Sequence, residues 1–260
     1  MQRQRFERKY FINERQAMEV REFVKCYLVP DEFSRTQPDY SYPVHSIYLD
    51  SPSLATYWAT VHCEKKRFKL RVRYYNDDLA APIFFEIKRR ENECVIKQRG
   101  MVRRDAGGLL LAGQMPGPEH LMSGKPQHLA AVQRFIFLMQ RLHAQPVVHV
   151  GYLREAWMSP QTNSVRVTID RKVRGELRRE PIFITRMADP IYTFGSQVVL
   201  ELKFTDRYPD WFSELVRHFN LTQSGAPKYC GSVMEAGEER IARASPQDLQ
   251  QKLARVLEFC

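Results

Sequence analysis

Charged and apolar side chains alternate along Phe68-Lys69-Leu70-Arg71-Val72-Arg73-Tyr74-Tyr75 and along Ile83-Phe84-Phe85-Glu86-Ile87-Lys88-Arg89. Successive side chains of a β-strand point to opposite faces of the sheet, so this pattern predicts two strands with one charged face each. Asn, Asp and Pro residues separate the two stretches, which is typical of a turn between antiparallel strands. A further strand is predicted from Val95 to Val102, so the three stretches together predict an antiparallel meander.

The same alternation recurs in other predicted strands. Their charged faces carry Glu7 with Lys9, Arg166 with Thr168 and Asp170, and Glu201 with Lys203. A solvated strand face is the simpler interpretation of any one of them, but solvated faces are richer in Thr, Ser and Gln. Amphipathic helices predicted at residues 14–28 and 245–259 also need the apolar faces of the strands to cover. If the sheet closes, the charged face becomes the interior of a barrel.

The chain has 260 residues, of which 43% are hydrophobic, enough to bury a sizeable core as one domain spanning residues 1–260. We predict an α+β fold in which helices flank an antiparallel β-barrel. Residues 105–145 differ in character, because Gly- and Pro-bearing loops lead into a helix there. We interpret this segment as a helical insertion between the two halves of the sheet.

Forty basic against thirty acidic residues give a net charge of +10, which favours polyanionic partners. Nucleic acid is not expected, because the basic residues alternate with glutamates on strand faces and no helix-turn-helix pattern occurs. No apolar run approaches the roughly 18 residues of a membrane span, and the first residues lack an apolar stretch. The five cysteines are scattered, so we expect reduced thiols in a cytoplasmic protein.

A basic interior would repel itself unless it held an anion, and phosphate oxygens match the fork of a guanidinium group. Carboxylates in such a cavity would repel phosphate, but they suit Mg²⁺ or Mn²⁺, which bind carboxylate and phosphate oxygens together. Neither a P-loop nor a Rossmann glycine motif occurs. The pattern therefore favours a metal-assisted phosphate site of another kind.

Short motifs follow one another in order through most of the chain: Glu7-Arg8-Lys9-Tyr10, Ser46-Ile47-Tyr48-Leu49-Asp50, Arg71-Val72-Arg73, Glu86-Ile87-Lys88, Tyr152-Leu153-Arg154, Arg166-Val167-Thr168-Ile169-Asp170, Glu201-Leu202-Lys203 and Lys228-Tyr229. Each is weak alone, but their order and strand placement together are specific. The series resembles the VTC domain, the polyphosphate polymerase branch of the triphosphate tunnel metalloenzymes, also called the CYTH superfamily.

The resemblance implies a tunnel of eight antiparallel strands that holds ATP, another triphosphate or polyphosphate beside Mn²⁺ or Mg²⁺. It implies that Lys9 and Arg166 are catalytic and lie near the transferred phosphoryl group. The implied metal ligands are Glu7, Glu86 and Glu201. The side chains implied to bind phosphates are Arg71, Arg73, Lys88, Lys97, Tyr152, Arg154, Arg166, Lys203 and Lys228, with Arg99 as a further candidate.

The chain departs from the family pattern at two positions. Arg5 stands where the superfamily has the first glutamate of Glu-x-Glu-x-Lys, and Pro227 stands where a serine is common. Val148, Val150, Tyr152 and Arg154 share one strand face, so we expect either a bulge or a place for Arg154 at the tunnel mouth.

Three functions stay open at this point. A polyphosphate polymerase would use ATP, a triphosphatase would let water attack instead, and a degraded metal site would leave a non-catalytic polyphosphate-binding module. A membrane-protein partner would be needed to hold the protein at the inner face of a membrane.

Overall fold

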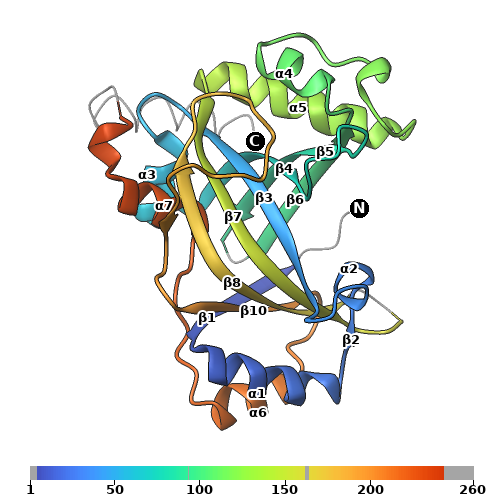
Figure 1. The fold of residues 1–260 in the computed structure, drawn as a ribbon, viewed down its shortest axis with the longest axis vertical. Coiled ribbons are helices and arrows are strands. Elements are labelled where there is room, and N and C mark those ends of the chain that lie inside the picture. Colours follow the sequence, from blue (N-terminus) through green and yellow to red (C-terminus); the bar gives the residue numbers. More distant parts are fainter. Residues whose placement is uncertain (1–4, 93, 162–163, 243–260) are drawn as a thin grey trace.

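A large antiparallel sheet with flanking helices forms the fold in the computed structural model, which describes residues 5–92, 94–161 and 164–242 (Figure 1). Eight strands follow one another in the order β1 (Phe6–Ile12), β10 (Val198–Phe204), β8 (Val165–Leu177), β7 (Gln145–Met158), β3 (Ser41–Asp50), β4 (Lys66–Tyr74), β5 (Ile83–Glu91) and β6 (Cys94–Val102). Two short strands, β2 (Val29–Pro30) and β9 (Ile191–Tyr192), pair with β7 and β8. The predicted α+β class and the eight-stranded antiparallel sheet are confirmed.

The first and last strands of this order, β1 and β6, meet at a seam. Within the described residues they share one antiparallel bridge, in which the Val95 amide donates to the Arg5 carbonyl oxygen at 3.1 Å. The sheet is therefore curled almost closed, whereas a fully closed barrel was expected. Both bridge residues lie at the beginnings of their strands, so the tilt and stagger of the strands leave little length for a ladder.

Helices cover the outer, apolar side of the sheet. α1 (Glu14–Lys25) and α6 (Asp210–His218) lie over β1, β8 and β10, and α5 (Pro126–Leu142) packs on β4 and β5. The ring of Phe135 on α5 meets that of Phe85 on β5 at 4.9 Å. α1 begins at the predicted cap, because the Asn13 side chain accepts from the Gln16 amide at 2.8 Å. With the apolar face covered in this way, the charged face points inward.

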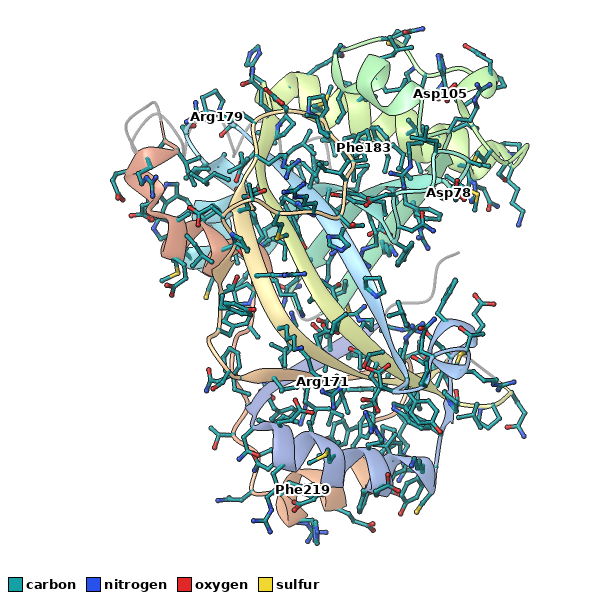
Figure 2. The ribbon with its side chains drawn as sticks, viewed as in Figure 1. Asp78, Asp105, Arg171, Arg179, Phe183 and Phe219 are labelled. Carbon is teal, nitrogen blue, oxygen red and sulfur yellow. The ribbon has the colours of Figure 1, made fainter. Side chains whose placement is uncertain are left out.

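Ion pairs also occur on the outer side, between the sheet and α1. Arg171 of β8 donates to Glu14 and to Glu155, each at 2.7 Å, and Figure 2 shows it between the sheet and that helix. Arg21 of α1 reaches Glu155 at 2.7 Å. These groups fix α1 on the wall and do not face the interior.

One end of the interior is filled by apolar and aromatic side chains. α3 (Ala55–Val61) and α7 (Lys228–Ala236) lie there side by side, and they pack against Tyr48, Val148 and Val150 (Figure 1). The bulge that we expected between Val148 and Arg154 is not found there; a bulge lies instead on β8, where Lys172 adopts φ 50° and the register with β7 shifts. Because the bulge is on the partner strand, β7 keeps its alternation and its four predicted residues share the inner face.

Several elements differ from their predictions. At the start of α3, Ser51, one of the two expected caps, accepts from the Ala55 amide at 2.9 Å, and the Asp50 carboxylate, which was not expected to take part, accepts from the Thr56 and Tyr57 amides at 2.9 Å. The short α2 (Glu32–Arg35), α7 and the 3-10 turn η2 (Glu238–Arg240) were not predicted. α4 (Ala106–Leu111), η1 (Pro118–His120) and α5 occupy the segment interpreted as an insertion. The helix predicted at residues 245–259 lies outside the described residues.

None of the helices within the described ranges is long and apolar enough to cross a membrane.

The contact between β6 and α5 depends on the absence of a side chain at Gly100. A Cβ atom there would overlap the Val132 side chain and would lie 2.7 Å from the His128 carbonyl oxygen of α5. We expect Gly100→Ala to lower the free energy of unfolding by about 1–3 kcal/mol, as overpacking does. Denaturant titration measures this loss.

The matched control for Gly100→Ala is Gly108→Ala in α4, where an added Cβ meets nothing within 4 Å. Alanine is the better helix former, so this control is expected to be neutral or to gain up to about 1 kcal/mol. Equal losses in the two variants would contradict the close β6–α5 contact.

Candidate anion and metal site

Strand register arranges the inward side chains of β1, β10 and β8 in rows. One row contains Glu7, Lys203 and Arg166, and the next contains Lys9, Glu201 and Thr168. A third row continues to β7 with Val199, Asp170 and Arg154. The alternation read from the sequence thus brings these predicted residues to one wall of the interior.

Glu201 is the centre of this wall. Its Oε1 atom lies 3.0 Å from Lys228 Nζ and 3.5 Å from Lys9 Nζ, and its Oε2 atom lies 2.6 Å from Lys203 Nζ. Burial alone would raise the pKa of Glu201, but Lys203, Lys228 and Lys9 together hold the pKa well below its usual range. This carboxylate therefore stays ionised.

Asp170 links two cations that come from different elements. Arg154 donates to both of its oxygens at 2.7 Å, and Lys228 Nζ lies 2.7 Å from Oδ2. Lys228 is the first residue of α7, and it also contacts Glu201. Asp170 was placed on the inner face by the sequence but was not among the predicted site residues.

Glu7 and Glu201 both contact Lys9. Lys9 Nζ lies 3.1 Å from Glu7 Oε1 and 3.5 Å from Glu201 Oε1, so these oxygens converge on one point. Mg²⁺ is commonly held by one or two carboxylates together with substrate phosphates, so the two side chains are of the right chemical type, while the Lys9 ammonium group occupies the space between them. No group of three or more His, Cys, Asp or Glu side chains suited to a metal occurs in the part of the chain that the structure describes.

Glu86, the third predicted metal ligand, lies among cations of the opposite wall. Arg71 Nη2 is 2.7 Å from its Oε2 atom, while Lys97 Nζ and Arg99 Nε are 2.6 and 3.2 Å from Oε1. Its side chain is fully buried. Burial opposes ionisation of Glu86, but Lys97 and Arg71 lead the cations that hold its pKa well below the usual range.

Three lysines lie directly opposite one another on neighbouring strands. Lys69 of β4 pairs in register with Lys88 of β5, which pairs with Lys97 of β6. Like charges opposite one another destabilise a sheet. Burial lowers the pKa of all three; Glu86 opposes this at Lys97, where the pKa still falls to about 7. Lys69 was not a predicted site residue, although it shares the strand face of Arg71.

Tyr152 joins the two walls. Its hydroxyl accepts a hydrogen bond from Arg73 Nη2 at 3.1 Å, and the charged groups of Arg154 and Lys228 each lie 5.1 Å from its ring centroid. Arg73 is itself 6% exposed. The predicted phosphate-binding residues of both walls therefore form one connected cluster.

The two predicted catalytic residues have different partners. Lys9 contacts Glu7 and Glu201, whereas Arg166 donates to Asp31 Oδ2 at 2.6 Å. Asp31 caps α2 through its other oxygen, which accepts from the Ser34 amide at 2.8 Å. No sequence pattern marked the Asp31 contact, because the two residues are far apart in the chain.

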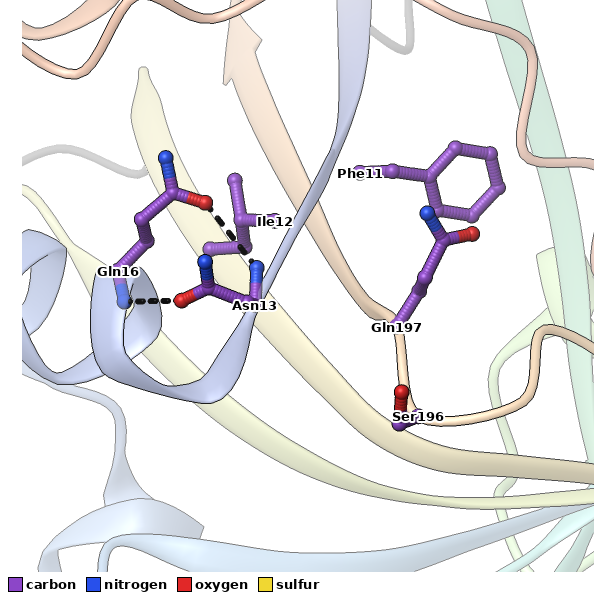
Figure 3. A pocket seen from close by; sticks show the side chains of 6 residues that line it. All are labelled: Phe11, Ile12, Asn13, Gln16, Ser196 and Gln197. Carbon is purple, nitrogen blue, oxygen red and sulfur yellow. Dashed lines mark hydrogen bonds between the residues drawn. The ribbon is translucent and has the colours of Figure 1, made fainter.

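A pocket of about 250 Å³ lies away from these cations, where β1 runs into α1 beside the start of β10 (Figure 3). It is lined by Phe11, Ile12, Asn13, Gln16, Ser196 and Gln197. None of these side chains is charged, so the pocket does not provide the anion site.

The depressed pKa of Lys97 makes anion affinity depend on pH. Above pH 7 this lysine loses its proton in the free protein, whereas a bound anion favours the protonated form. We expect the affinity for tripolyphosphate to fall as the pH rises from 7 to 9. Per pH unit, this fall should be up to about tenfold greater in the unaltered protein than in Lys97→Gln, which lacks the titrating group. Calorimetry measures the affinity of both proteins at each pH, and protonation of the ligand itself affects both equally. The same pH dependence of affinity in the two proteins would contradict the prediction.

Fold and site together define an antiparallel, nearly closed sheet around a buried basic cluster. The chain matches the VTC domain over residues 4–236 and belongs to the VTC domain family. The family resemblance drawn from the short motifs is confirmed. No curated protein matches the chain.

Solved structures include two similar chains. One is a putative adenylate cyclase from Bacillus halodurans, with 11% identity, a TM-score of 0.47, and coverage of 85% of this chain and 92% of the other. The second is the Mimivirus capping enzyme triphosphatase, with 12% identity, a TM-score of 0.33, and coverage of 84% and 89%.

Proposed function

We propose that the protein carries out metal-dependent phosphoryl transfer on a triphosphate or polyphosphate held in its basic interior, as an ATP-dependent polyphosphate polymerase. The row formed by Lys69, Lys88 and Lys97 is the observation that carries this proposal. Lys88 and Lys97 each have one carboxylate partner, Glu7 and Glu86, but three adjacent half-buried ammonium groups outnumber these two partners, and a phosphate chain supplies a negative charge for each unit.

Basic side chains outnumber the carboxylates throughout the interior. The cations are Lys9, Lys69, Arg71, Arg73, Lys88, Lys97, Arg99, Arg154, Arg166, Lys203 and Lys228, and the carboxylates are Glu7, Asp31, Glu86, Asp170 and Glu201. The carboxylates hold the cations in place, and the surplus of positive charge supports the binding of a polyanion. Arginine forks and lysine ammonium groups are both suited to phosphate oxygens.

Glu7 and Glu201 are the proposed ligands of Mn²⁺ or Mg²⁺, with Glu86 as a further candidate on the opposite wall. Such an ion, when bound, supplies charge neutralisation to the phosphoryl group in transfer. Lys9 lies between the two carboxylates, so it would contact the same phosphate. Arg166 would hold the neighbouring phosphate nearer to Asp31.

Phosphoryl transfer needs in-line placement and charge stabilisation rather than a protein nucleophile. An oxygen of the terminal phosphate of a growing chain attacks the γ phosphorus of ATP, the bond to the β-phosphate oxygen breaks, and ADP leaves. Arg71, Arg73, Arg154 and Lys228 would keep the reacting phosphates aligned. The absence of a nucleophile motif from the sequence is consistent with this scheme.

The triphosphatase differs from the polymerase only in the attacking group, which is then water. The polyphosphate-binding module would retain the cations without turnover.

For location, we propose the cytoplasm, with a membrane-protein partner as the means of attachment to the inner face of a membrane. The five cysteines are scattered along the sequence without a CxxC pair, which supports a reducing compartment.

The proposal is tested by incubating purified protein with ATP and Mn²⁺ while phosphate release and chain length on a gel are both followed. Long chains that disappear when the metal is chelated establish a polymerase. Free phosphate without chains establishes a triphosphatase. Tripolyphosphate binding without turnover leaves the binding module, and the absence of both binding and turnover overturns the proposal.

A further inference from the structure

A cluster of aromatic rings lies beside the basic interior. Phe33 of α2 stacks on Tyr75 with a centroid distance of 6.0 Å and an interplanar angle of 10°, and it lies 5.6 Å from Tyr42 of β3. Tyr75 in turn meets Phe84 of β5 edge-on at 5.9 Å. Tyr42 and Phe84 are buried, whereas Phe33 is 52% exposed. The cluster therefore presents one ring of a supported stack to solvent.

Arg99 connects this cluster to the proposed phosphate site. Its guanidinium lies 3.5 Å from the ring centroid of Phe84, and its Nη2 atom donates to the Tyr75 hydroxyl at 3.2 Å. The same side chain lies 3.2 Å from Glu86 Oε1. The rings and the cations of the β4–β6 wall are thus in direct contact.

A second connection runs through Asp31, the N-cap residue of α2. Its Oδ2 atom accepts hydrogen bonds from Arg166 at 2.6 Å and from the Tyr42 hydroxyl at 3.2 Å. The short helix that carries Phe33 is therefore tied to a proposed catalytic arginine on the other wall. The exposed ring sits where both walls of the charged interior end.

An exposed phenylalanine ring beside phosphate-binding cations matches the two parts of a nucleotide. Aromatic side chains stack on nucleobases, and each such stack is worth about 1–3 kcal/mol with little preference among bases. We propose that Phe33, supported by Tyr75, is a stacking platform for the nucleobase of a nucleoside triphosphate whose phosphates lie in the basic interior. This inference rests on the proposed function and assigns the part of the substrate that inorganic triphosphate lacks.

Comparing ATP with inorganic tripolyphosphate isolates the contribution of the base. We expect Phe33→Ala to weaken ATP binding about tenfold in calorimetry and to leave tripolyphosphate binding within about twofold of the unaltered protein. Phe33→Trp, which keeps a stacking ring, is expected to retain the affinity for ATP. The matched control is Phe137→Ala on α5, a ring of 40% exposure outside the site, which should change neither ligand.

The outcomes separate the platform from the function on which it rests. Unchanged ATP binding in Phe33→Ala would overturn the platform, and so would an equal loss for both ligands, because that would indicate a role for α2 in holding Arg166. If the unaltered protein bound neither ATP nor tripolyphosphate, the proposed function itself would fail. Selective loss of ATP, restored by tryptophan, supports the platform.

Discussion

Replacing Glu201 with glutamine is expected to reduce turnover of ATP at least about 100-fold while anion binding is kept. The side chain keeps its shape, but the negative charge that faces Lys9, Lys203 and Lys228 is lost. A neutral amide is a poor ligand for Mn²⁺ or Mg²⁺, so the metal would be lost. The positive surplus of the interior grows at the same time, so tripolyphosphate should bind at least as tightly.

The comparison needs a buried carboxylate that does not face the interior. Glu155 is fully buried and lies on the outer wall between Arg21 and Arg171. Glu155→Gln should therefore cost stability while turnover per folded molecule is retained. ADP formation and tripolyphosphate affinity are measured for both variants, and full activity in Glu201→Gln would remove this residue from the proposed metal site.

Asp170→Asn is expected to destabilise the fold by about 3–5 kcal/mol, because it leaves two buried cations without their shared carboxylate. Asp170 is fully buried between Arg154 and Lys228. Burial alone would raise the pKa of Asp170, but Arg154 and Lys228 lower it, so the charged form is the one that the fold contains. For a chain of this size, the loss corresponds to a fall in Tm of roughly 6–20 °C.

Tripolyphosphate should restore part of this Tm, because the anion supplies the missing negative charge between the two cations. The control is Glu19→Gln, which removes the exposed partner of Arg15 on α1 and should cost less than about 0.5 kcal/mol. A loss no greater than that of the control would show that Asp170 does not hold the two cations together.

Alternation along the strands was enough to predict which charged side chains share a strand face, whereas the roles proposed for them came from the family resemblance. Alternation placed Glu86, Lys88 and Glu201 on the inner face without any knowledge of the fold, and the same rule would have identified Lys69. Strand patterns succeed here because a sheet covered by helices on one side has only one place for its charged face.

Contacts made by loops and by tertiary packing could not be predicted from the alternation of side chains along strands. Asp31 meets Arg166 only after the chain between them has folded, and no local pattern marks the pair. α7 has no side-chain cap at Pro227 and contains Gly231, so its sequence favours a helix weakly. Burial of Tyr229 and Val233 against α3 and the sheet decides its structure instead. The incomplete closure depended on strand stagger, which alternation alone does not determine.

The seam between β1 and β6 is held by few contacts rather than by a continuous ladder of backbone hydrogen bonds. Most neighbouring strands pair along a full ladder of hydrogen bonds, whereas these two share the Arg5–Val95 bridge. Across the seam, Lys88 Nζ also lies 3.0 Å from Glu7 Oε2. The width of the interior at this point therefore depends on side-chain contacts and on any anion that these side chains bind. A phosphate chain that contacts both Lys88 and Lys9 would hold the two sides of the seam together. Binding of the anion would therefore stabilise the closed form of the sheet that surrounds it.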